Sequence, residues 1–236
     1  MQEWACEYAL VIHHPVRLEG RLDPSHSRWL WLVKWALLIP HFVILAFLWI
    51  AFVLTTIAAF FVLLFTGRYP RGIFGFNLGV LRWTWRVSFY GYGALATERY
   101  PPFSLGEEPD YPARLDIPYP EQQRRGLPLI GWWIIGAPQY TIAGIFFGGG
   151  YAIGGGWGFG GIIDILMFVV AMLLLFKDRY PTDVFEVAMG FNRYVARTLA
   201  YAAFMTPQYP PFRFDPGGME APPPPLEPLT PSAYAP

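Results

Sequence analysis

The sequence predicts an all-α membrane protein that is a tandem duplication of a membrane helical hairpin followed by an amphipathic interfacial helix. Three observations predict this fold class: an apolar composition, two long stretches without charge, and motifs that recur in the same order. Hydrophobic residues make up 54% of the 236-residue chain and charged residues only 14%, whereas soluble domains carry about 25% charged residues. Aromatic residues reach 19%, and Trp and Tyr gather at membrane–water interfaces.

Two segments are apolar enough to enter a membrane. Between Lys34 and Arg68 the chain has no charged residue, and a second charge-free stretch occupies 126–163. After Asp164 the apolar sequence resumes as far as Phe176. Since about 18 consecutive apolar residues indicate a spanning helix, we expect both segments to be embedded in the membrane.

Several short motifs occur twice in the same order. The matched segments are Phe65–Pro70 with Phe176–Pro181, Arg82 with Arg193, Arg86 with Arg197, and Tyr100–Phe103 with Tyr209–Phe212. Such repetition predicts a tandem duplication, with copies at 14–103 and 111–212 and a linker at 104–110 between them. An N-terminal arm at 1–13 precedes the copies. A Pro-rich tail at 213–236 follows them, and its composition favours an extended polyproline conformation.

Glycine punctuates the second apolar stretch. Residues 148–161 read GGGYAIGGGWGFGG, and glycine runs favour turns, so we expect a loop between two membrane helices. The first copy has no such loop, and Trp29 to Gly67 would extend about 58 Å as a single helix, near twice the hydrocarbon thickness. We expect this segment to turn near its middle. A break at Pro40 into an interfacial helix and one span is the alternative.

The positions of Lys and Arg predict the topology. Each Lys and Arg lies in the N-terminal segment up to Lys34, between the copies, after a hairpin or in the tail, and the expected hairpin turns have none. Under the positive-inside rule these segments face the cytoplasm, which predicts a multi-pass protein of the cell membrane with cytoplasmic termini. Two crossings combined with helices in the membrane plane would explain much of the same pattern, so two and four crossings both stay open.

An amphipathic segment follows each expected hairpin. Arg82 and Arg86 share one helical stripe after the first hairpin, and Arg193 and Arg197 share the corresponding stripe after the second. Charge inside a spanning helix is costly, whereas a helix in the membrane plane directs Arg to lipid phosphates. We therefore expect these four arginines to anchor the protein at lipid headgroups.

The tripeptide Arg-Tyr-Pro occurs three times, at 68–70, 99–101 and 179–181. At the end of a membrane helix, Arg reaches lipid phosphate, Tyr suits the headgroup region and Pro ends the helix. We therefore assign a membrane-anchoring role to its members Arg68, Tyr69, Pro70, Arg99, Tyr100, Arg179 and Tyr180. A binding site formed where the two copies converge is the alternative.

The paired motifs resemble a known family. Together with the segment His14–Glu19 (HPVRLE) and the Ile-Pro-His sequence at 39–41, the Arg-Tyr-Pro and Tyr-Pro-Pro-Phe motifs resemble the bacterial and archaeal domain-of-unknown-function family 4389. The resemblance covers the first copy well and the second more loosely, because Gln139 replaces the His and Gln208 replaces an Arg. The family has no established activity, so the resemblance supports the architecture and implies no function.

Asp164 is the one carboxylate inside an apolar segment. An ionisable group within a membrane is a candidate for proton or ion passage. Its place just after the glycine-rich stretch also suits an acid that reaches the interface or accepts hydrogen bonds from loop N–H groups. The first copy has Val53 at the matching place, so the sequence offers no paired acid site.

His41 is the candidate cofactor-binding residue, since a membrane His can ligate haem iron or chlorophyll magnesium. The second copy has Gln139 at the matching position, so a second histidine ligand is missing and an interfacial or helix-capping role is the other interpretation. His13, His14 and His26 lack the spacing of a metal site. We therefore expect no metal and no resident cofactor.

The residue inventory favours a membrane subunit without catalytic activity. The sequence shows no acid–base pair, no nucleophile with a base and no metal cluster. The 17 basic and 17 acidic residues balance, which gives no net field to attract nucleic acid. We expect an accessory or scaffold subunit whose partners are the lipid bilayer and other membrane proteins or itself. A small-solute transporter or channel and a haem- or chlorophyll-binding subunit are the alternatives.

Overall fold

Helices dominate the part of the chain that the structure describes. The computed structural model describes residues 14–24, 27, 29–121, 123, 136–146, 161–177 and 180–220. The elements in chain order are β1 (Arg17–Gly20), α2 (Leu30–Thr66), α3 (Arg71–Gly91), β2 (Ala113–Asp116), α4 (Ala137–Phe146), α6 (Ile162–Lys177) and α7 (Thr182–Ala202). The protein is therefore mostly helical, as the sequence predicts, but it also contains a strand pair that the all-α prediction omits.

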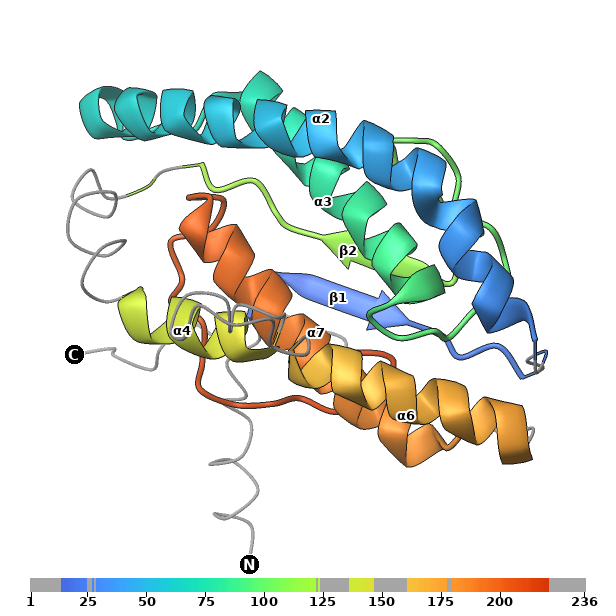
Figure 1. Ribbon diagram of the computed structural model, residues 1–236. Coiled ribbons are helices and arrows are strands. Elements are labelled where there is room, and N and C mark those ends of the chain that lie inside the picture. Colours follow the sequence, from blue (N-terminus) through green and yellow to red (C-terminus); the bar gives the residue numbers. More distant parts are fainter. Residues whose placement is uncertain are drawn as a thin grey trace, which may run out of the picture.

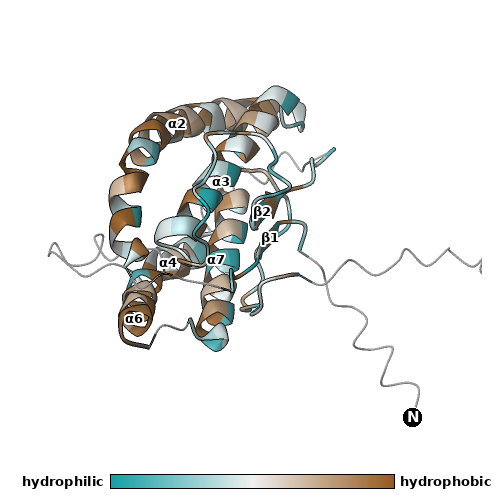
Figure 2. Ribbon diagram, turned by 90° about the vertical axis from the view of Figure 1, so that its right-hand side faces the viewer, coloured by the Kyte–Doolittle hydropathy of each residue, from teal (hydrophilic) through white to brown (hydrophobic). Residues whose placement is uncertain are grey.

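The elements form three layers. The strands β1 and β2 pair antiparallel, with Leu18 opposite Leu115, and lie on one side of the molecule (Figure 2). α3 and α7 lie next to the strands, and α2 and α6 lie on the side away from them. Figure 1 shows α2 above the strand pair and α6 below it. The helices of the middle layer are therefore covered on both sides.

A proline of the Arg-Tyr-Pro motif precedes a long helix in the first half of the molecule (β1, α2 and α3) and in the second (β2, α4, α6 and α7). Gly67 ends α2 with a φ of 71° and donates its N–H to the carbonyl oxygen of Leu63 at 2.8 Å; glycine adopts this left-handed conformation without steric cost. Pro70 then precedes α3 with a φ of −62°, and Pro181 precedes α7 with a φ of −67°. α2 packs on α3 and α6 on α7, each as an antiparallel pair (Figure 1).

The helix that follows each turn packs against the strand of the other half. α3 contacts β2, and α7 contacts β1. Nε of Arg82 donates to the carbonyl oxygen of Leu115 at 3.0 Å, and Nε of Arg193 donates to that of Leu18 at 2.9 Å. Because Leu18 and Leu115 are paired in the sheet, these corresponding contacts reach opposite residues of the strand pair.

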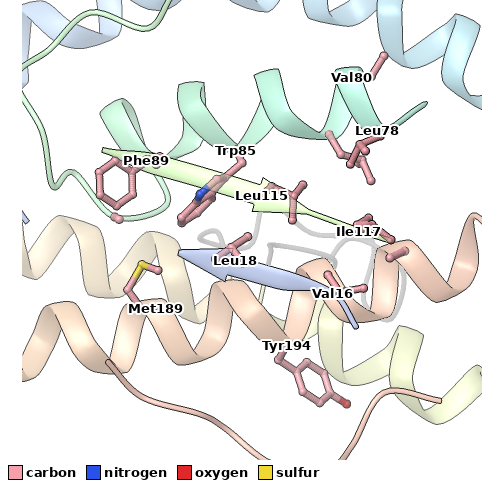
Figure 3. Packing of buried hydrophobic residues seen from close by; sticks show 14 of the residues in the cluster. Val16, Leu18, Leu78, Val80, Trp85, Phe89, Leu115, Ile117, Met189 and Tyr194 are labelled. Carbon is pink, nitrogen blue, oxygen red and sulfur yellow. The ribbon is translucent and has the colours of Figure 1, made fainter. Parts of the chain in front are cut away.

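The hydrophobic core is shared by the two halves. Figure 3 shows β1 and β2 between α3 and α7, with side chains of all four elements packed together. The labelled members of this core are Val16, Leu18, Leu78, Val80, Trp85, Phe89, Leu115, Ile117, Met189 and Tyr194. α3 packs mainly on β2 and α7 on β1, so full burial of the strand pair requires both halves.

α2 corrects the hairpin that the sequence predicts for the first copy. It is helical without interruption from Leu30 to Thr66 and includes Pro40, so the expected turn near its middle and the alternative break at Pro40 are both wrong. At 1.5 Å per residue the helix extends about 55 Å. Proline removes one helical hydrogen bond, but a buried stripe on both sides of Pro40 packs against α3 and keeps the helix whole. The stripe consists of Lys34, Leu38, His41, Leu45, Phe52, Ala59 and Leu63.

Within the described residues, α2 is the one helix that is long and apolar enough to cross a membrane. α6 is apolar but shorter, with 16 residues, and α4 has ten. The N-terminal arm at 1–13, the glycine-rich loop at 148–160 and the tail beyond Glu220 lie outside the described residues. The predicted second hairpin therefore has two of its helical parts in the structure, while the loop between them is not described.

Candidate functional site

The side of the molecule formed by α2 and α6 exposes large hydrophobic side chains, and we call this surface the apolar layer. Its exposed members include Val33, Trp35, Ile39, Val43, Phe47, Ile50, Leu54, Ile57, Phe61 and Phe65 on α2, and Ile162, Ile165, Phe168, Val169 and Phe176 on α6. Both helices are coloured mostly as hydrophobic in Figure 2 and lie on the same side. Exposed apolar surface of this extent is typical of contact with a membrane or with another protein.

The strand side is charged instead. A pocket of about 290 Å³ lies there, and its charged lining residues are Arg17, Arg82, Arg86, Arg114, Glu19, Glu107, Glu108 and Asp116. Arg17 and Glu19 also form an ion pair at 3.2 Å. Because the positive and negative groups balance, this pocket has no net field that would select an anion or a cation. The strand side is thus suited to water, in contrast to the apolar layer.

Arg82 and Arg86 bind within the chain. Nη2 of Arg82 lies 2.9 Å from Oε1 of Glu107 and 3.0 Å from Oδ1 of Asp116. Arg86 is buried, and its Nη1 donates to the backbone carbonyl of Gly106 at 3.0 Å. The two guanidinium groups therefore hold the segment between α3 and β2 against α3.

Arg193 and Arg197 are also buried and paired. Nε of Arg193 lies 3.1 Å from Oε1 of Glu220, and Nη1 of Arg197 lies 2.6 Å from Oδ2 of Asp215. Burial lowers the pKa of Arg193, and the charge of Glu220 opposes that shift. The four arginines assigned to headgroups, Arg82, Arg86, Arg193 and Arg197, thus all have partners inside the protein. The reason is the position of α3 and α7 in the middle layer, between the strands and the apolar layer.

Two of the Arg-Tyr-Pro tyrosines lie in the interior rather than at a headgroup level. Tyr69 is buried, and its hydroxyl oxygen accepts a hydrogen bond from Nδ2 of Asn77 at 3.0 Å. The hydroxyl of Tyr180 donates to the carbonyl oxygen of Ala94 at 2.6 Å. Burial raises the pKa of Tyr69 to about 12, so this phenol stays neutral. Tyr180 joins its half of the molecule to the other.

The remaining members of the motif lie nearer the surface. Arg68 is exposed in the turn between α2 and α3. Arg99 is exposed, and its Nη1 donates to the carbonyl oxygen of Asp110 at 2.6 Å. The hydroxyl of Tyr100 donates to the carbonyl oxygen of Leu37 at 3.1 Å. Arg179 lies outside the described residues. Headgroup anchoring by the exposed arginines stays a prediction.

His41 is enclosed by aromatic rings. It has no exposed surface; its ring stacks on Phe103 with 4.0 Å between centroids, and its Nδ1 accepts a hydrogen bond from Nε1 of Trp83 at 3.0 Å. A neutral imidazole that accepts at Nδ1 carries its proton on Nε2. No ring nitrogen then offers a free lone pair to iron or magnesium, so the geometry suits packing and hydrogen bonding better than cofactor ligation.

Gln139 takes the corresponding place in the second half. Its Oε1 accepts a hydrogen bond from the hydroxyl of Tyr194, and its Nε2 donates to the carbonyl oxygen of Pro210 at 2.9 Å. Tyr194 follows Trp83 by 111 residues, the spacing of the repeated motifs. The pairs Trp83–His41 and Tyr194–Gln139 are therefore corresponding contacts, between α3 and α2 in the first half and between α7 and α4 in the second.

Asp164 lies in the first turn of α6 and is exposed. Its Oδ2 accepts a hydrogen bond from the N–H of Gly161 at 3.0 Å, which is the loop contact that the sequence suggested as one of its roles. Carboxylates are favourable in the first turn because helix N-termini carry partial positive charge. Within the described residues, no group of three or more His, Cys, Asp or Glu side chains is arranged to hold a metal ion.

Comparison with known proteins identifies a family for this chain. The chain matches the family described as a domain of unknown function (DUF4389) over residues 28–104 and 158–213. The two ranges cover more than half of the chain and contain α2 with α3 and α6 with α7. The protein belongs to the DUF4389 family. No curated protein and no solved structure matches it.

The DUF4389 ranges also contain interior polar residues that the sequence analysis did not select. Lys34 is buried, and its Nζ donates to the carbonyl oxygen of Thr97 at 2.7 Å and lies 4.9 Å from the centroid of the Tyr90 ring. Asn77 is buried and bound to Tyr69. Their helical spacing from buried apolar residues of the same helix is the one sequence signal that could have found them.

A second cavity of this DUF4389 protein lies between its two halves and is largely apolar. Its volume is about 430 Å³, and α3 and α7 supply most of its lining. Trp49 of α2 and Tyr140 and Ala143 of α4 form its wall toward the apolar layer. Such a cavity leaves no motif in the sequence, because it arises where side chains of separate elements meet.

Proposed function

We propose that this DUF4389 protein is a non-catalytic accessory or scaffold subunit, seated in a membrane through its apolar layer. The observation that carries the proposal is the separation of two surfaces. α2 and α6 expose large hydrophobic side chains on one side, whereas the strand side exposes charged residues. Water solvates the charged side well, while lipid or the apolar face of another membrane protein suits the other.

The same separation favours a seat in the plane of one leaflet over the multi-pass arrangement. Figure 1 shows α2 running alongside the strand pair, so a crossing α2 would bring charges such as Arg114 and Asp116 to hydrocarbon depth, which is costly. Exposed apolar side chains also run from Val33 to Phe65, about 48 Å at 1.5 Å per residue. The hydrocarbon core is about 30 Å thick, so a helix lying in the plane fits better.

The sidedness of two cysteines tests this seat. In a Cys6→Ser background, Arg68→Cys marks the turn between α2 and α3, and Ser104→Cys marks the segment after α3. Each is treated in sealed vesicles with a thiol reagent that cannot cross the membrane. Because α2 and α3 are antiparallel, an in-plane seat predicts that both cysteines react from the same side. Reaction from opposite sides would mean that the two helices cross, and the multi-pass topology would replace the in-plane one.

The interior polar groups support a structural role rather than catalysis. His41, Gln139 and the paired arginines make contacts that join elements of the fold. Photocrosslinking from Phe47 on α2 and Phe168 on α6, both exposed, tests for a protein partner. A subunit predicts a crosslink of defined mass to one membrane protein or to a second copy. Lipid adducts at both positions, with no protein adduct, would contradict the scaffold role.

We also infer that the two halves derive from one duplicated unit. Support comes from contacts that recur with the same partners in kind, namely Arg82 with Leu115 and Arg193 with Leu18, and Trp83 with His41 and Tyr194 with Gln139. Duplicated units also occur in transporters. A solute flux in vesicles reconstituted with the purified chain would favour the transporter alternative over the scaffold.

A further inference from the structure

The cavity between the halves has the size and lining of a binding site for an apolar molecule. Its volume of about 430 Å³ lies within the range of small-molecule pockets, about 300–1,000 Å³. Leu18 and Leu115 of the strand pair and Trp85 of α3 contribute to it, and Figure 3 shows these three side chains near one another between α3 and α7. None of its lining residues is charged, so an ionic ligand would find no counter-charge there.

Small side chains keep this space open. α7 contributes Ala196 and Ala202, and α4 contributes Ala143. Larger apolar residues at these places would fill the space, as interiors otherwise pack to high density. The wall toward the apolar layer includes Trp49 of α2, so the cavity adjoins the helices that we propose to face lipid.

A buried hydroxyl of the lining, on α7, has no hydrogen-bond partner within the described residues. Thr198 on α7 is 3% exposed, and its hydroxyl makes no hydrogen bond. Other helical threonines donate to the carbonyl four residues earlier, as Thr84 does to Val80 at 2.8 Å and Thr141 to Ala137 at 3.0 Å. A buried hydroxyl without a partner costs free energy, so this donor is suited to an acceptor on a bound molecule.

We propose that this cavity binds one fatty-acyl chain of an esterified lipid, with the ester carbonyl accepting a hydrogen bond from the Thr198 hydroxyl. The apolar lining receives the chain, and the charged or polar headgroup stays outside because the lining offers it no charge. An ester suits the site better than a free fatty acid, whose carboxylate would be left without a counter-charge. The proposal does not depend on a scaffold role or on the way in which α2 meets the membrane.

Tryptophan quenching in detergent micelles tests the site on the full-length chain. The probe is a fatty-acyl methyl ester with bromines at mid-chain, which quench nearby Trp; Trp49 and Trp85 line the cavity. We expect a saturable component at one ester per chain, above the linear quenching caused by partition into micelles. Absence of any saturable component in the wild-type protein would overturn the proposal, whatever the variants do.

Matched variants locate the binding. Ala143→Leu fills the cavity and should reduce the affinity at least tenfold, whereas Ala137→Leu, exposed on the same helix, should leave it unchanged. Thr198→Val should weaken binding about fivefold through loss of one hydrogen bond, with Thr141→Val as its control. Equal binding by Ala143→Leu and wild type would place the ester elsewhere and overturn the site. Tighter binding of the brominated free acid than of its ester would overturn the role of Thr198.

Discussion

The two halves of the molecule hold the same arginine pair in different surroundings. In the first half the side chain of Arg82 is 18% exposed and its partner Glu107 is 69% exposed. In the second half the side chain of Arg193 is 1% exposed and its partner Glu220 is 12% exposed. Water screens the first pair and not the second. A shared motif therefore specifies where a charge lies, while the surrounding layers decide how much the charge contributes to stability.

A second contrast concerns the contact of α3 with α2 in the first half and the matching contact of α7 with α4 in the second. In the first half, Trp83 donates to His41, whose ring is stacked on Phe103. In the second half, Tyr194 donates to Gln139, which also binds a backbone carbonyl. In both contacts an aromatic side chain donates to a buried acceptor, which is a stacked imidazole in the first half and a side-chain amide in the second. Substitutions on the two sides measure how far the halves are interchangeable.

The largest effect is expected from Glu220, which pairs with the two buried arginines of the second half. Glu220→Ala should lower the free energy of unfolding by about 3–5 kcal/mol, because it leaves Arg193 and Arg197 buried without that partner. Glu107→Ala, the matched change in the first half, should cost about 1 kcal/mol or less. Thermal unfolding followed by circular dichroism in detergent measures both. Equal losses would show that exposure does not separate the two pairs.

His14 should make stability depend on pH. It is buried, and its Nδ1 accepts from the N–H of Val16 at 3.2 Å. Burial, with a smaller contribution from the charge of Arg197, lowers its pKa from 6.5 to about 4. The folded state therefore takes up this proton at a lower pH than the unfolded state does. The contribution of neutral His14 to the free energy of unfolding is fully present above pH 6.5 and is lost as the pH falls toward 4. The loss is about 3 kcal/mol at 1.4 kcal/mol per pKa unit.

The variant His14→Gln isolates this dependence. Its stability should change less between pH 6.5 and 4 than that of the wild type, and the difference between the two proteins gives the contribution of His14. Parallel curves for the two proteins would mean that His14 does not titrate in this window. Because the charge of Arg197 contributes less than burial to the lowered pKa of His14, Arg197→Gln should reduce the same pH dependence only slightly.

Removal of one hydroxyl probes the second contrast. Tyr194→Phe leaves Oε1 of Gln139 buried without its donor, which should cost about 1–3 kcal/mol. The double variant Tyr194→Phe with Gln139→Leu should recover part of this loss, since the buried acceptor is then absent. Thermal unfolding of the single and double variants gives the coupling energy. No recovery in the double variant would assign the loss to packing instead of the hydrogen bond.

The smallest effect is expected at Asp164. Asp164→Asn should leave assembly intact and lower stability by about 1 kcal/mol or less, because Asn can still accept from the N–H of Gly161. The matching place in the first half is Val53, so no paired acid loses its partner. Size-exclusion chromatography and thermal unfolding measure these outcomes. Loss of a solute or proton flux in reconstituted vesicles would instead make Asp164 functional and favour a transporter.

Local features of the sequence predict much of the helical structure. The apolar segments become α2 and α6, and the Arg-Tyr-Pro motif precedes α3 and α7 through Pro70 and Pro181, because proline fixes its own φ. Local features did not predict the continuity of α2, for which the sequence suggested a hairpin. Pro40 and the length of the segment favour an interruption, but packing of one continuous stripe of α2 against α3 outweighs that preference.

The sequence by itself determined that the chain is apolar, mostly helical, repetitive in its motifs and a member of a family without known activity, since composition, spacing and turn chemistry are local properties. Only the tertiary structure decided the partners of the arginines and of Tyr69 and Tyr180, the enclosure of His41 and the cavity beside Thr198. Those features depend on which elements cover one another. Because each half places its helix on the strand of the other, residues that local pattern assigned to a lipid interface became part of the interior.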